Sequence, residues 1–184
     1  KTAYDLLQTT PGLQFSQNGG PGRTASVYIR GANSNQTLIL VDGMRINSNT
    51  DGAANLDRIA AENIERIEVL RGSQSALHGS DAIGGVINIV TRKEADETKL
   101  SVSGEAGNYR HRKSVLNASA KVGAVDIVAD VTYAELGDFS VAPEEEGNRE
   151  SDEYRKFSAH ANLGFDFLDD GRFDLIGLYS KHNA

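Results

Sequence analysis

Residues 64–91 read IERIEVLRGSQSALHGSDAIGGVINIVT, and this stretch decides the fold class. Two strand-like runs, residues 64–70 and 85–91, lie on either side of a compact glycine-rich connection. Residues 73–78 within the connection are expected to form a short helical turn. Four glycines mark positions where the backbone needs a positive φ or a close approach, namely Gly72, Gly79, Gly84 and Gly85. The stretch therefore predicts two strands joined by an ordered turn.

Two shorter motifs precede this stretch, YIRG at residues 28–31 and LILVDG at residues 38–43. They predict strands over residues 26–30 and 37–42. The second strand is a continuous apolar run, which is typical of a strand buried on both faces of a sheet.

Helices are predicted over residues 2–8, where Thr2 is placed as the N-cap, and over residues 56–63. Two polar loops, residues 17–23 and 47–54, interrupt these elements. Residues 1–95 are therefore predicted to form a small α+β domain with two long polar loops.

From residue 98 onward the sequence alternates between apolar and polar residues. Apolar-out and polar-in alternation is what a strand between lipid and a wet barrel lumen shows, and short connections alternate here with a long acidic one. A soluble antiparallel sheet covered on one face fits the same alternation and is the more common structure. Strands are predicted at residues 98–106, 113–122, 125–134, 154–167 and 172–180.

Charge is distributed unevenly along the chain. Residues 1–95 hold nine Lys or Arg and nine Asp or Glu, so the whole net charge of −7 lies in residues 96–184. An acidic balance excludes a surface built to neutralise nucleic-acid phosphates. Cysteine is absent, which excludes disulfides and thiolate metal sites. No run of 18 or more apolar residues exists, so an ordinary transmembrane helix is excluded and a transmembrane barrel stays open.

The motifs, in this order, resemble the plug domain of TonB-dependent outer-membrane receptors, and the residues after Thr91 resemble the first strands of the receptor barrel. Within that family they are most similar to the cobalamin (vitamin B12) receptor group. Ser73 and His78 depart from the plug pattern, because many plugs have Pro and Tyr there. The stretches that carry the resemblance are TPGLQFSQNGGPGRTASVYIRG (10–31), LILVDGMRIN (38–47), ERIEVLRG (65–72) and SALHGSDAIGGVINI (75–89).

The resemblance implies an α+β plug domain over residues 1–95, followed over residues 96–184 by the first antiparallel strands of a transmembrane β-barrel. The intact family barrel has about 22 strands, so the chain is expected to be a fragment. The implied function is energised uptake of a scarce nutrient, cobalamin, across the outer membrane of a Gram-negative bacterium. The implied partners are outer-membrane lipid and TonB, the latter through a segment expected upstream of Lys1.

Two sets of plug residues follow from the resemblance. Arg30 and Arg71 are predicted to pair with barrel glutamates and lock the plug to the wall, or else they are solvated residues at strand ends. The two polar loops are predicted to touch the ligand, or else their Gly and Asn residues only form turns. The predicted ligand-binding residues are Asn18, Arg23, Asn49, Thr50 and Asp51.

An acidic segment over residues 138–153 is a predicted calcium site, because the corresponding loops bind calcium in the cobalamin receptor group and hard oxygen ligands suit that ion. The alternative is a solvated acidic face, and no EF-hand spacing is present. The predicted metal ligands are Asp138, Glu150, Asp152 and Glu153. The four histidines show no paired ligand spacing.

Other functions are weighed against the transporter. No G-x-S-x-G, H-E-x-x-H or P-loop motif is present, so no catalytic residues are expected and the chain is not predicted to be an enzyme. A soluble, plug-like periplasmic binding module stays open for residues 1–95. Within the transporters, a siderophore (ferric-chelate) receptor is the main alternative to a cobalamin receptor.

Overall fold

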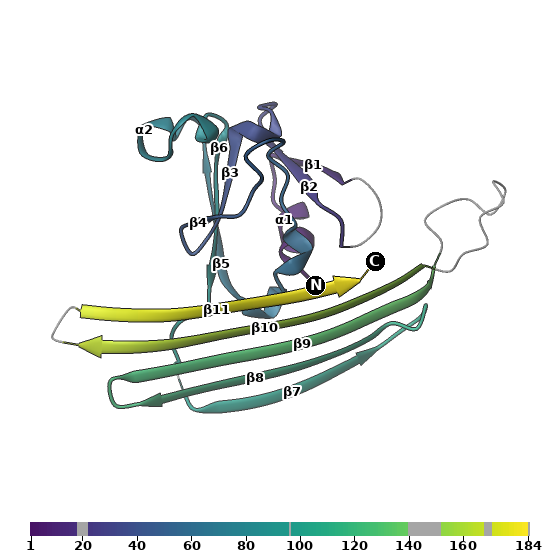
Figure 1. The fold of residues 1–184 in the computed structure, drawn as a ribbon, viewed down its shortest axis with the longest axis vertical. Helices are drawn as coiled ribbons and strands as arrows, with labels where there is room; N and C mark the ends of the chain where they lie inside the picture. Colours follow the sequence, from purple (N-terminus) through teal and green to yellow (C-terminus); the bar gives the residue numbers. More distant parts are fainter. Residues whose placement is uncertain (18–21, 96, 140–151, 168–170, 184) are drawn as a thin grey trace. The chain divides into compact units, whose positions relative to one another are not determined.

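The computed structural model describes residues 1–17, 22–95, 97–139, 152–167 and 171–183. The chain divides into two compact units, unit 1 (Lys1–Thr91) and unit 2 (Arg92–Ala184), which follow one another along the colour scale of Figure 1. The predicted boundary after residue 95 and this division both lie in the connection between β6 (Gly85–Thr91) and β7 (Lys99–Ala106). Among the described residues, no helix is long and apolar enough to cross a membrane.

A four-stranded mixed sheet of order β4-β3-β6-β5 is the centre of unit 1. The predicted strands at residues 37–42, 64–70 and 85–91 are confirmed. β3 pairs in parallel with β6, and β4 and β5 join as antiparallel edge strands. Every residue of β3 is buried, as its continuous apolar run predicts. The three strands not yet delimited are β3 (Thr37–Val41), β4 (Met44–Arg45) and β5 (Ile64–Arg71).

A second, two-stranded antiparallel sheet pairs β1 (Leu13–Gln17) with β2 (Ala25–Ile29). β2 confirms its prediction, whereas β1 was not predicted. Helix α1 (Ala3–Gln8) also forms as predicted, and the Thr2 amide donates to the Asp5 carboxylate at 2.8 Å in the first turn. One hydrophobic core unites these parts, built from Ala3, Leu7, Val27, Ile29, Ile39, Val41, Ala54, Leu56, Ile59, Ile87 and Ile89.

The prediction of a helix over residues 56–63 is wrong. Two short 3₁₀ turns form instead, η2 (Leu56–Arg58) and η3 (Ala61–Asn63). Between them the backbone is extended, because it pairs with the start of the chain. The Ile59 carbonyl accepts from the Ala3 amide at 2.9 Å, and an isolated β-bridge joins Ala60 to Thr2. A tertiary contact has therefore overridden a local helical preference.

Two left-handed dipeptides end the strands of the YIRG and LILVDG motifs. Arg30 and Gly31 have φ of 51° and 80°, and Asp42 and Gly43 have φ of 50° and 82°. Positive φ at both central residues is the signature of a type I′ turn, which reverses a twisted strand tightly. The Asp42 carboxylate also accepts from the amide and hydroxyl of Thr91, at 3.0 and 2.6 Å. This side chain thereby fastens the β3–β4 turn to the end of β6.

The glycine-rich connection between β5 and β6 is ordered, as predicted. It contains helix α2 (Ser75–His78) and the 3₁₀ turn η4 (Ser80–Ala82). Gly85 has φ of 150°, and a Cβ there would overlap the Leu70 carbonyl of the neighbouring strand. Only glycine therefore permits β6 to begin this close to β5.

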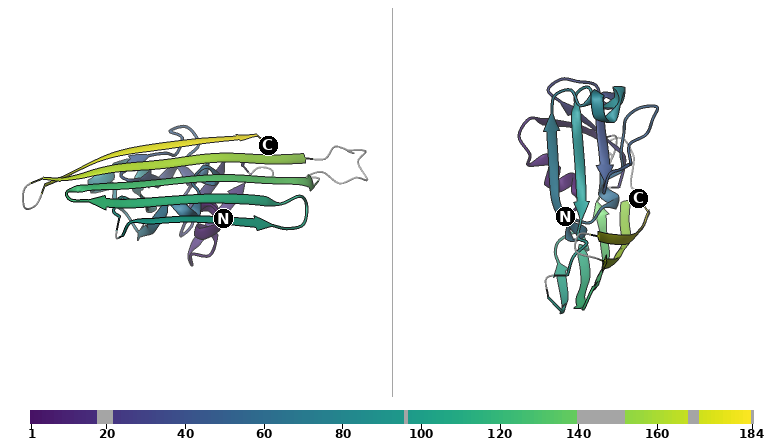
Figure 2. Two further views of the ribbon diagram at one scale, coloured as in Figure 1. Left: turned by 90° about the horizontal axis from the view of Figure 1, so that it is seen from below. Right: turned by 90° about the vertical axis from the view of Figure 1, so that its left-hand side faces the viewer.

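Unit 2 is an antiparallel meander of order β11-β10-β9-β8-β7, whose strands lie side by side (Figure 2). All five predicted strands are confirmed. β9 and β11 continue past their predicted ends at residues 134 and 180. The strands that follow β7 are β8 (Arg112–Val122), β9 (Val125–Phe139), β10 (Asp152–Phe167) and β11 (Gly171–Asn183).

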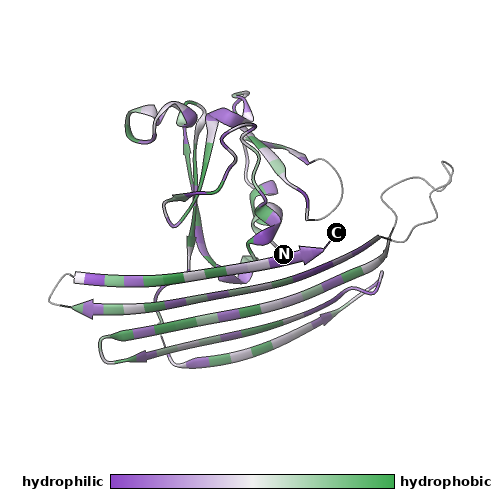
Figure 3. Ribbon diagram, in the orientation of Figure 1, coloured by the Kyte–Doolittle hydropathy of each residue, from purple (hydrophilic) through white to green (hydrophobic). Residues whose placement is uncertain are grey.

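Burial in unit 2 is inverted relative to a soluble protein. Polar side chains of β9 and β10 are buried, among them Asp126, Asp130, Thr132, Ser158, His160 and Asn162. Large apolar side chains on the alternating positions are exposed, among them Ile127, Tyr133, Phe157, Phe165, Phe173 and Leu175. Figure 3 shows hydrophilic and hydrophobic residues alternating along these strands. A soluble half-covered sheet would bury its apolar face, so the pattern is that of strands facing lipid.

We predict that the chain, expressed alone, self-associates in aqueous buffer, because unit 2 exposes large apolar side chains and, within the part of the chain that the structure describes, its edge strands β7 and β11 each pair on one side only. Size-exclusion chromatography should show large aggregates without detergent and a discrete species after refolding with detergent. A soluble monomer without detergent would contradict the assignment of the exposed face.

We also predict that Asp42→Ala lowers the stability of unit 1 by about 2 kcal/mol, since hydrogen bonds to charged groups contribute about 1.5–3 kcal/mol. Asp42→Asn should cost less, because Asn tolerates positive φ and keeps one acceptor. Hydrogen exchange of the Thr91 amide measures both effects. Equal exchange in Asp42→Ala and the parent protein would show that the carboxylate does not hold β6.

Candidate functional site

The predicted ligand loop at residues 47–54 is a compact turn with an exposed tip. The Ser48 amide donates to the Ala53 carbonyl at 2.9 Å, and the Gly52 amide donates to the Ser48 carbonyl at 3.0 Å. Asn49, Thr50 and Asp51 are exposed at this tip. Their side chains are therefore presented on a fixed backbone.

The same loop is fastened to the 3₁₀ turn η1 (Ser34–Gln36). The Ser34 hydroxyl donates to the Asp51 carbonyl at 2.8 Å, and a Cβ on Gly52 would overlap the backbone of Ser34. Asn47, at the root of the loop, is buried and uses its side chain internally: Oδ1 accepts from the Ile39 amide and Nδ2 donates to the Thr37 carbonyl, both at 3.2 Å. Asn47 is accordingly a structural residue.

Asp51 carries a negative charge over a wide pH range. Its pKa lies below the ordinary value, because the Ala53 amide donates to its carboxylate at 3.0 Å and the Ser48 hydroxyl adds a second hydrogen bond. The tip of the loop therefore offers an amide, a hydroxyl and a carboxylate within three consecutive residues.

The structure brings the two predicted ligand loops together. Ala25 and Ala54 exchange two backbone hydrogen bonds of 2.9 Å, and the Asn55 side chain donates to the Gly22 carbonyl at 2.9 Å. Arg23, which is exposed, lies between these two attachments in the chain. Asn18 lies outside the described residues. For Arg23, Asn49, Thr50 and Asp51, contact with a ligand stays a prediction.

Sequence reasoning missed a buried carboxylate beneath the loops. Asp57 is 8% exposed and accepts from the Thr2 hydroxyl (2.9 Å), the Gln17 side-chain amide (3.2 Å) and the Gly22 backbone amide (2.8 Å). We call these four residues the Asp57 junction. The available signal was one carboxylate between the apolar residues Leu56 and Ile59, in a segment predicted to be helical.

Arg30 and Arg71 are both exposed in the structure. Arg30 lies in the turn after β2, and Arg71 ends β5 and donates from Nη2 to the Pro11 carbonyl at 2.7 Å. No carboxylate of the described residues forms an ion pair with either side chain. The described residues therefore hold no partner for the predicted lock, and the pairing with barrel glutamates stays a prediction.

The predicted calcium ligands lie mostly beyond what the structure describes. Glu150 is outside the described residues, and only the backbone of Asp138 and Asp152 is described. The Glu153 carboxylate contacts Arg155 Nη2 at 2.9 Å and Arg110 Nη1 at 3.6 Å. Within the described ranges, no three His, Cys, Asp or Glu residues are grouped to hold a metal ion.

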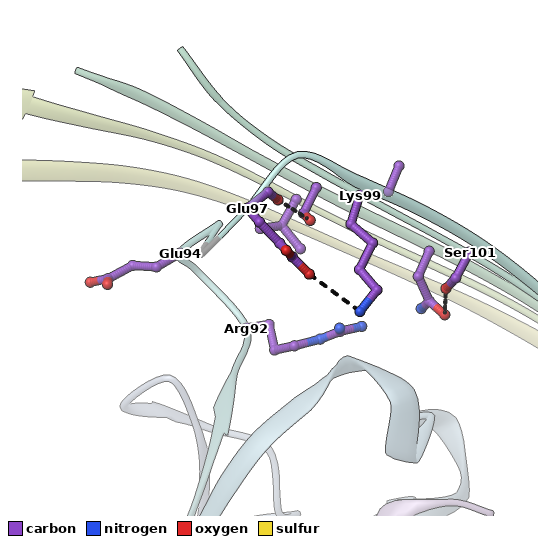
Figure 4. A pocket seen from close by; sticks show the side chains of 9 residues that line it. Arg92, Glu94, Glu97, Lys99 and Ser101 are labelled. Carbon is purple, nitrogen blue, oxygen red and sulfur yellow. Dashed lines mark hydrogen bonds and ion pairs between the residues drawn. The ribbon is translucent and has the colours of Figure 1, made fainter. Parts of the chain in front are cut away.

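Unit 2 has a polar cavity of about 280 Å³ near its first residues (Figure 4). Lys99 and Glu97 form an ion pair of 3.4 Å there, and Arg92 lies beside them. The Arg92 guanidinium donates to Asp130 of β9 at 2.6 Å. The remaining residues that line the cavity are Glu94, Ser101, Asn117, Ala118, Ser119 and Val128.

The next residue of this connection is held as well. The Lys93 carbonyl accepts from Asn162 of β10 at 2.6 Å and from Arg172 of β11 at 3.1 Å. Asp130, which receives Arg92, also accepts from Asn117 at 2.6 Å and lies 3.1 Å from His160 Nδ1. Residues 92–93 are thus fixed to three strands of the meander.

Residues 1–86 match the family model described as TonB-dependent Receptor Plug Domain. The chain belongs to the TonB-dependent receptors. Unit 1 is therefore the plug, and we call β7–β11 the wall strands. These receptors are proteins of the Gram-negative outer membrane, so the predicted localisation is confirmed, and the exposed apolar face of the wall strands agrees with it.

Curated relatives agree with this assignment. The chain is 45% identical over 121 residues to a protein named Vitamin B12 transporter BtuB from Vibrio vulnificus strain YJ016, with coverage of 66% of this chain and 20% of the relative. A second protein of that name, from Vibrio vulnificus strain CMCP6, is 41% identical over 150 residues, which cover 80% of this chain and 24% of the relative. The chain thus spans about a fifth to a quarter of the length of these relatives.

Solved structures share the fold. The ferripyoverdine receptor of the outer membrane of Pseudomonas aeruginosa superposes with a TM-score of 0.78 and 24% identity, over 98% of this chain and 23% of that chain. The structure titled Copper transporter OprC superposes with a TM-score of 0.76 and 22% identity, over 98% of this chain and 28% of that chain. The predicted fold class, an α+β plug followed by the first antiparallel strands of a barrel, is confirmed by these structures.

We predict that Arg30→Ala and Arg71→Ala each destabilise the plug in the intact receptor by about 3–5 kcal/mol, because a buried wall carboxylate would lose its partner. Arg66→Ala is the matched control. Arg66 pairs on the surface with Glu65 and Glu68, where water screens the ion pairs, so its loss should lower the stability of the plug far less. Chemical denaturation of the plug within the receptor measures all three variants. Values for Arg30 and Arg71 as small as that for Arg66 would identify them as solvated strand-end residues.

Proposed function

We propose that the intact protein is a TonB-dependent outer-membrane receptor for energised uptake of cobalamin. The observation that carries the proposal is the identity of 41–45% with proteins named Vitamin B12 transporter, over 121–150 residues of this chain. The proposed partner that supplies work is TonB, acting on residues upstream of Lys1. The proposed role is binding and transport without catalysis.

The chemistry of the two joined loops supports this ligand. Cobalamin carries peripheral amides, which donate and accept hydrogen bonds, and one phosphodiester, which is anionic. Asn49 and Thr50 offer matching amide and hydroxyl groups, Asp51 accepts from amide donors, and the exposed Arg23 suits the phosphate. Because the backbone beneath these residues is hydrogen-bonded, the ligand would meet a preorganised surface with little entropy left to lose.

Gating would follow from the division of the chain into a folded plug and a barrel wall. A barrel of about 22 strands encloses a lumen too wide for side chains to fill, so a folded domain must close it. The plug has its own hydrophobic core and its own sheet, and these would let it block the lumen as a rigid body. Ligand capture on the loops and displacement of the plug would then be separate steps.

A siderophore receptor is the second candidate, because solved structures that share the fold include receptors for ferric chelates. Their identity of 24% or less supports the fold and leaves the ligand open. A soluble periplasmic module is disfavoured, since the wall strands expose Phe157, Phe165 and Phe173 on an apolar face.

Calcium binding to the acidic loop stays part of the proposal, with one change. Glu153 does not fit as a calcium ligand, because Arg155 and Arg110 already neutralise its carboxylate. The role is therefore proposed for Asp138, Glu150 and Asp152. Bound calcium would reduce the repulsion among these carboxylates and order the loop.

We predict that the intact receptor, purified in detergent, binds cobalamin, and that Arg23→Ala weakens binding about tenfold through loss of one charge-assisted contact. Equilibrium titration measures both affinities. Arg58→Ala is the matched control, because Arg58 is an exposed arginine of the plug outside the two ligand loops. No detectable binding by the parent receptor, with binding of a ferric siderophore in the same assay, would assign the second candidate.

The same titration, repeated with a calcium chelator, tests whether calcium strengthens the binding of cobalamin. Weaker cobalamin binding in chelator than in calcium supports a calcium site in the acidic loop. Equal affinity in both removes calcium from the proposal and leaves the cobalamin assignment intact.

A further inference from the structure

The connection that follows the plug is attached to four of the wall strands. We call its described residues, 92–95 and 97, the strap, and all of them belong to unit 2. Four strap residues form hydrogen bonds to the polar face of the strands. These bonds, in chain order, join Arg92 to Asp130 of β9 (2.6 Å), the Lys93 carbonyl to Asn162 of β10 (2.6 Å) and Arg172 of β11 (3.1 Å), the Ala95 amide to the Asp126 carboxylate of β9, and the Glu97 carbonyl to Ser119 of β8 (2.8 Å).

Arg172 is the strap contact with the most partners. A guanidinium has five N–H donors in a rigid fork, and here each donor has an oxygen acceptor. Nε and one donor of Nη2 bond Asp174, both at 3.1 Å. Nη1 bonds Asp126 at 2.8 Å and Asp166 at 2.9 Å. Three carboxylates therefore fix the orientation of the fork, and the remaining Nη2 donor points at the Lys93 carbonyl.

Space for this guanidinium comes from Gly164. In the register of the sheet, Gly164 of β10 lies between Asp126 of β9 and Asp174 of β11. A Cβ on Gly164 would overlap Arg172 Nη2, the atom that donates to the strap. The absent side chain on one strand and the carboxylates on its two neighbours thus form a cradle for the arginine that holds the strap.

Thr91 and Arg92 are consecutive residues, and they are held by different units. Thr91 ends β6, and its amide and hydroxyl donate to Asp42 of the plug at 3.0 and 2.6 Å. Arg92 donates to Asp130 of the wall strands at 2.6 Å. Only one peptide unit and its flanking dihedral angles lie between these attachments. Hinges consist of a few such residues at the ends of elements, where changes in φ and ψ are absorbed.

We propose that the strap is a fixed anchor during transport, and that Arg172 is the positioning residue that holds it to the wall strands. The plug moves about the backbone between Thr91 and Arg92, and the strap stays in place. The transport part rests on the proposed function. The plug is then retained at this end while other parts of it are displaced.

Trypsin tests the attachment without ligand, because Arg92 and Lys93 are both residues after which it cleaves. Cleavage requires the strap to leave the strands, so its rate follows the population of the detached form. In the intact receptor, Arg172→Gln should raise cleavage after these two residues about tenfold through loss of a charge-assisted bond. Arg172→Lys keeps the charge without the fork and should also raise it. Mass spectrometry of the new peptide ends measures the rates.

Arg155→Gln is the matched control, because Arg155 of β10 pairs with Glu153 at 2.9 Å and does not contact the strap. Its cleavage rate should equal that of the parent. Asn162→Ala removes the second donor to the Lys93 carbonyl and keeps the test valid if Arg172→Gln fails to fold. Unchanged cleavage in both Arg172→Gln and Asn162→Ala, or an equal rise in Arg155→Gln, would overturn the role of Arg172.

A reversible crosslink tests whether the strap stays attached during transport. The sequence has no cysteine, so Lys93→Cys and Asn162→Cys introduce a defined pair into this part of the receptor, which a short thiol-specific crosslinker joins. Cobalamin uptake by cells with the crosslinked receptor should equal that of the two single-cysteine variants treated in the same way. Loss of uptake that reduction restores would show that the strap must detach, and would overturn the anchor. Absence of uptake by the parent receptor would refute the proposed function, while trypsin would still decide whether Arg172 holds the strap.

Discussion

β3 and β6 pair in parallel, and the rest of the plug is arranged around this contact. Two parallel neighbours require a long connection, which here contains β4, the loop at residues 47–54, the 3₁₀ turns η2, η3 and η4, strand β5 and helix α2. Asp42, in the turn after β3, also links the two strands, because its carboxylate accepts two hydrogen bonds from Thr91 at the end of β6. The candidate ligand loop is therefore part of the connection that makes the parallel pair possible, which explains how an exposed polar loop has a rigid base.

In the wall strands the decisive constraint is the solvent on each side of the sheet. A soluble sheet and a barrel wall share the alternation of apolar and polar residues, and they differ in which side is buried. Here Asp126, Asp130 and His160 are buried while Phe157 and Phe173 are exposed. Buried polar groups of this kind need partners, and Asp130 finds them in Arg92, Asn117 and His160.

Much of the fold could be predicted from the sequence because its signals are local. The strands beside glycine turns and the alternating wall strands depend on φ preferences and on a period of two. β1 was missed because it pairs through only five residues with partly exposed side chains. The segment at residues 56–63 and the role of Asp57 could not be predicted, since both depend on contacts with Thr2, which is distant in sequence.

The order of the strands also has a kinetic consequence. Each wall strand pairs with its neighbour in sequence, so those hairpins close short loops, whereas Thr37 must find Gly85 before the plug sheet exists. Pairings between distant residues form more slowly, because the entropy of loop closure is lost before any contact compensates for it. During biogenesis the apolar hairpins should thus be present while the plug is still open, and their insertion into lipid must outpace their association with other chains.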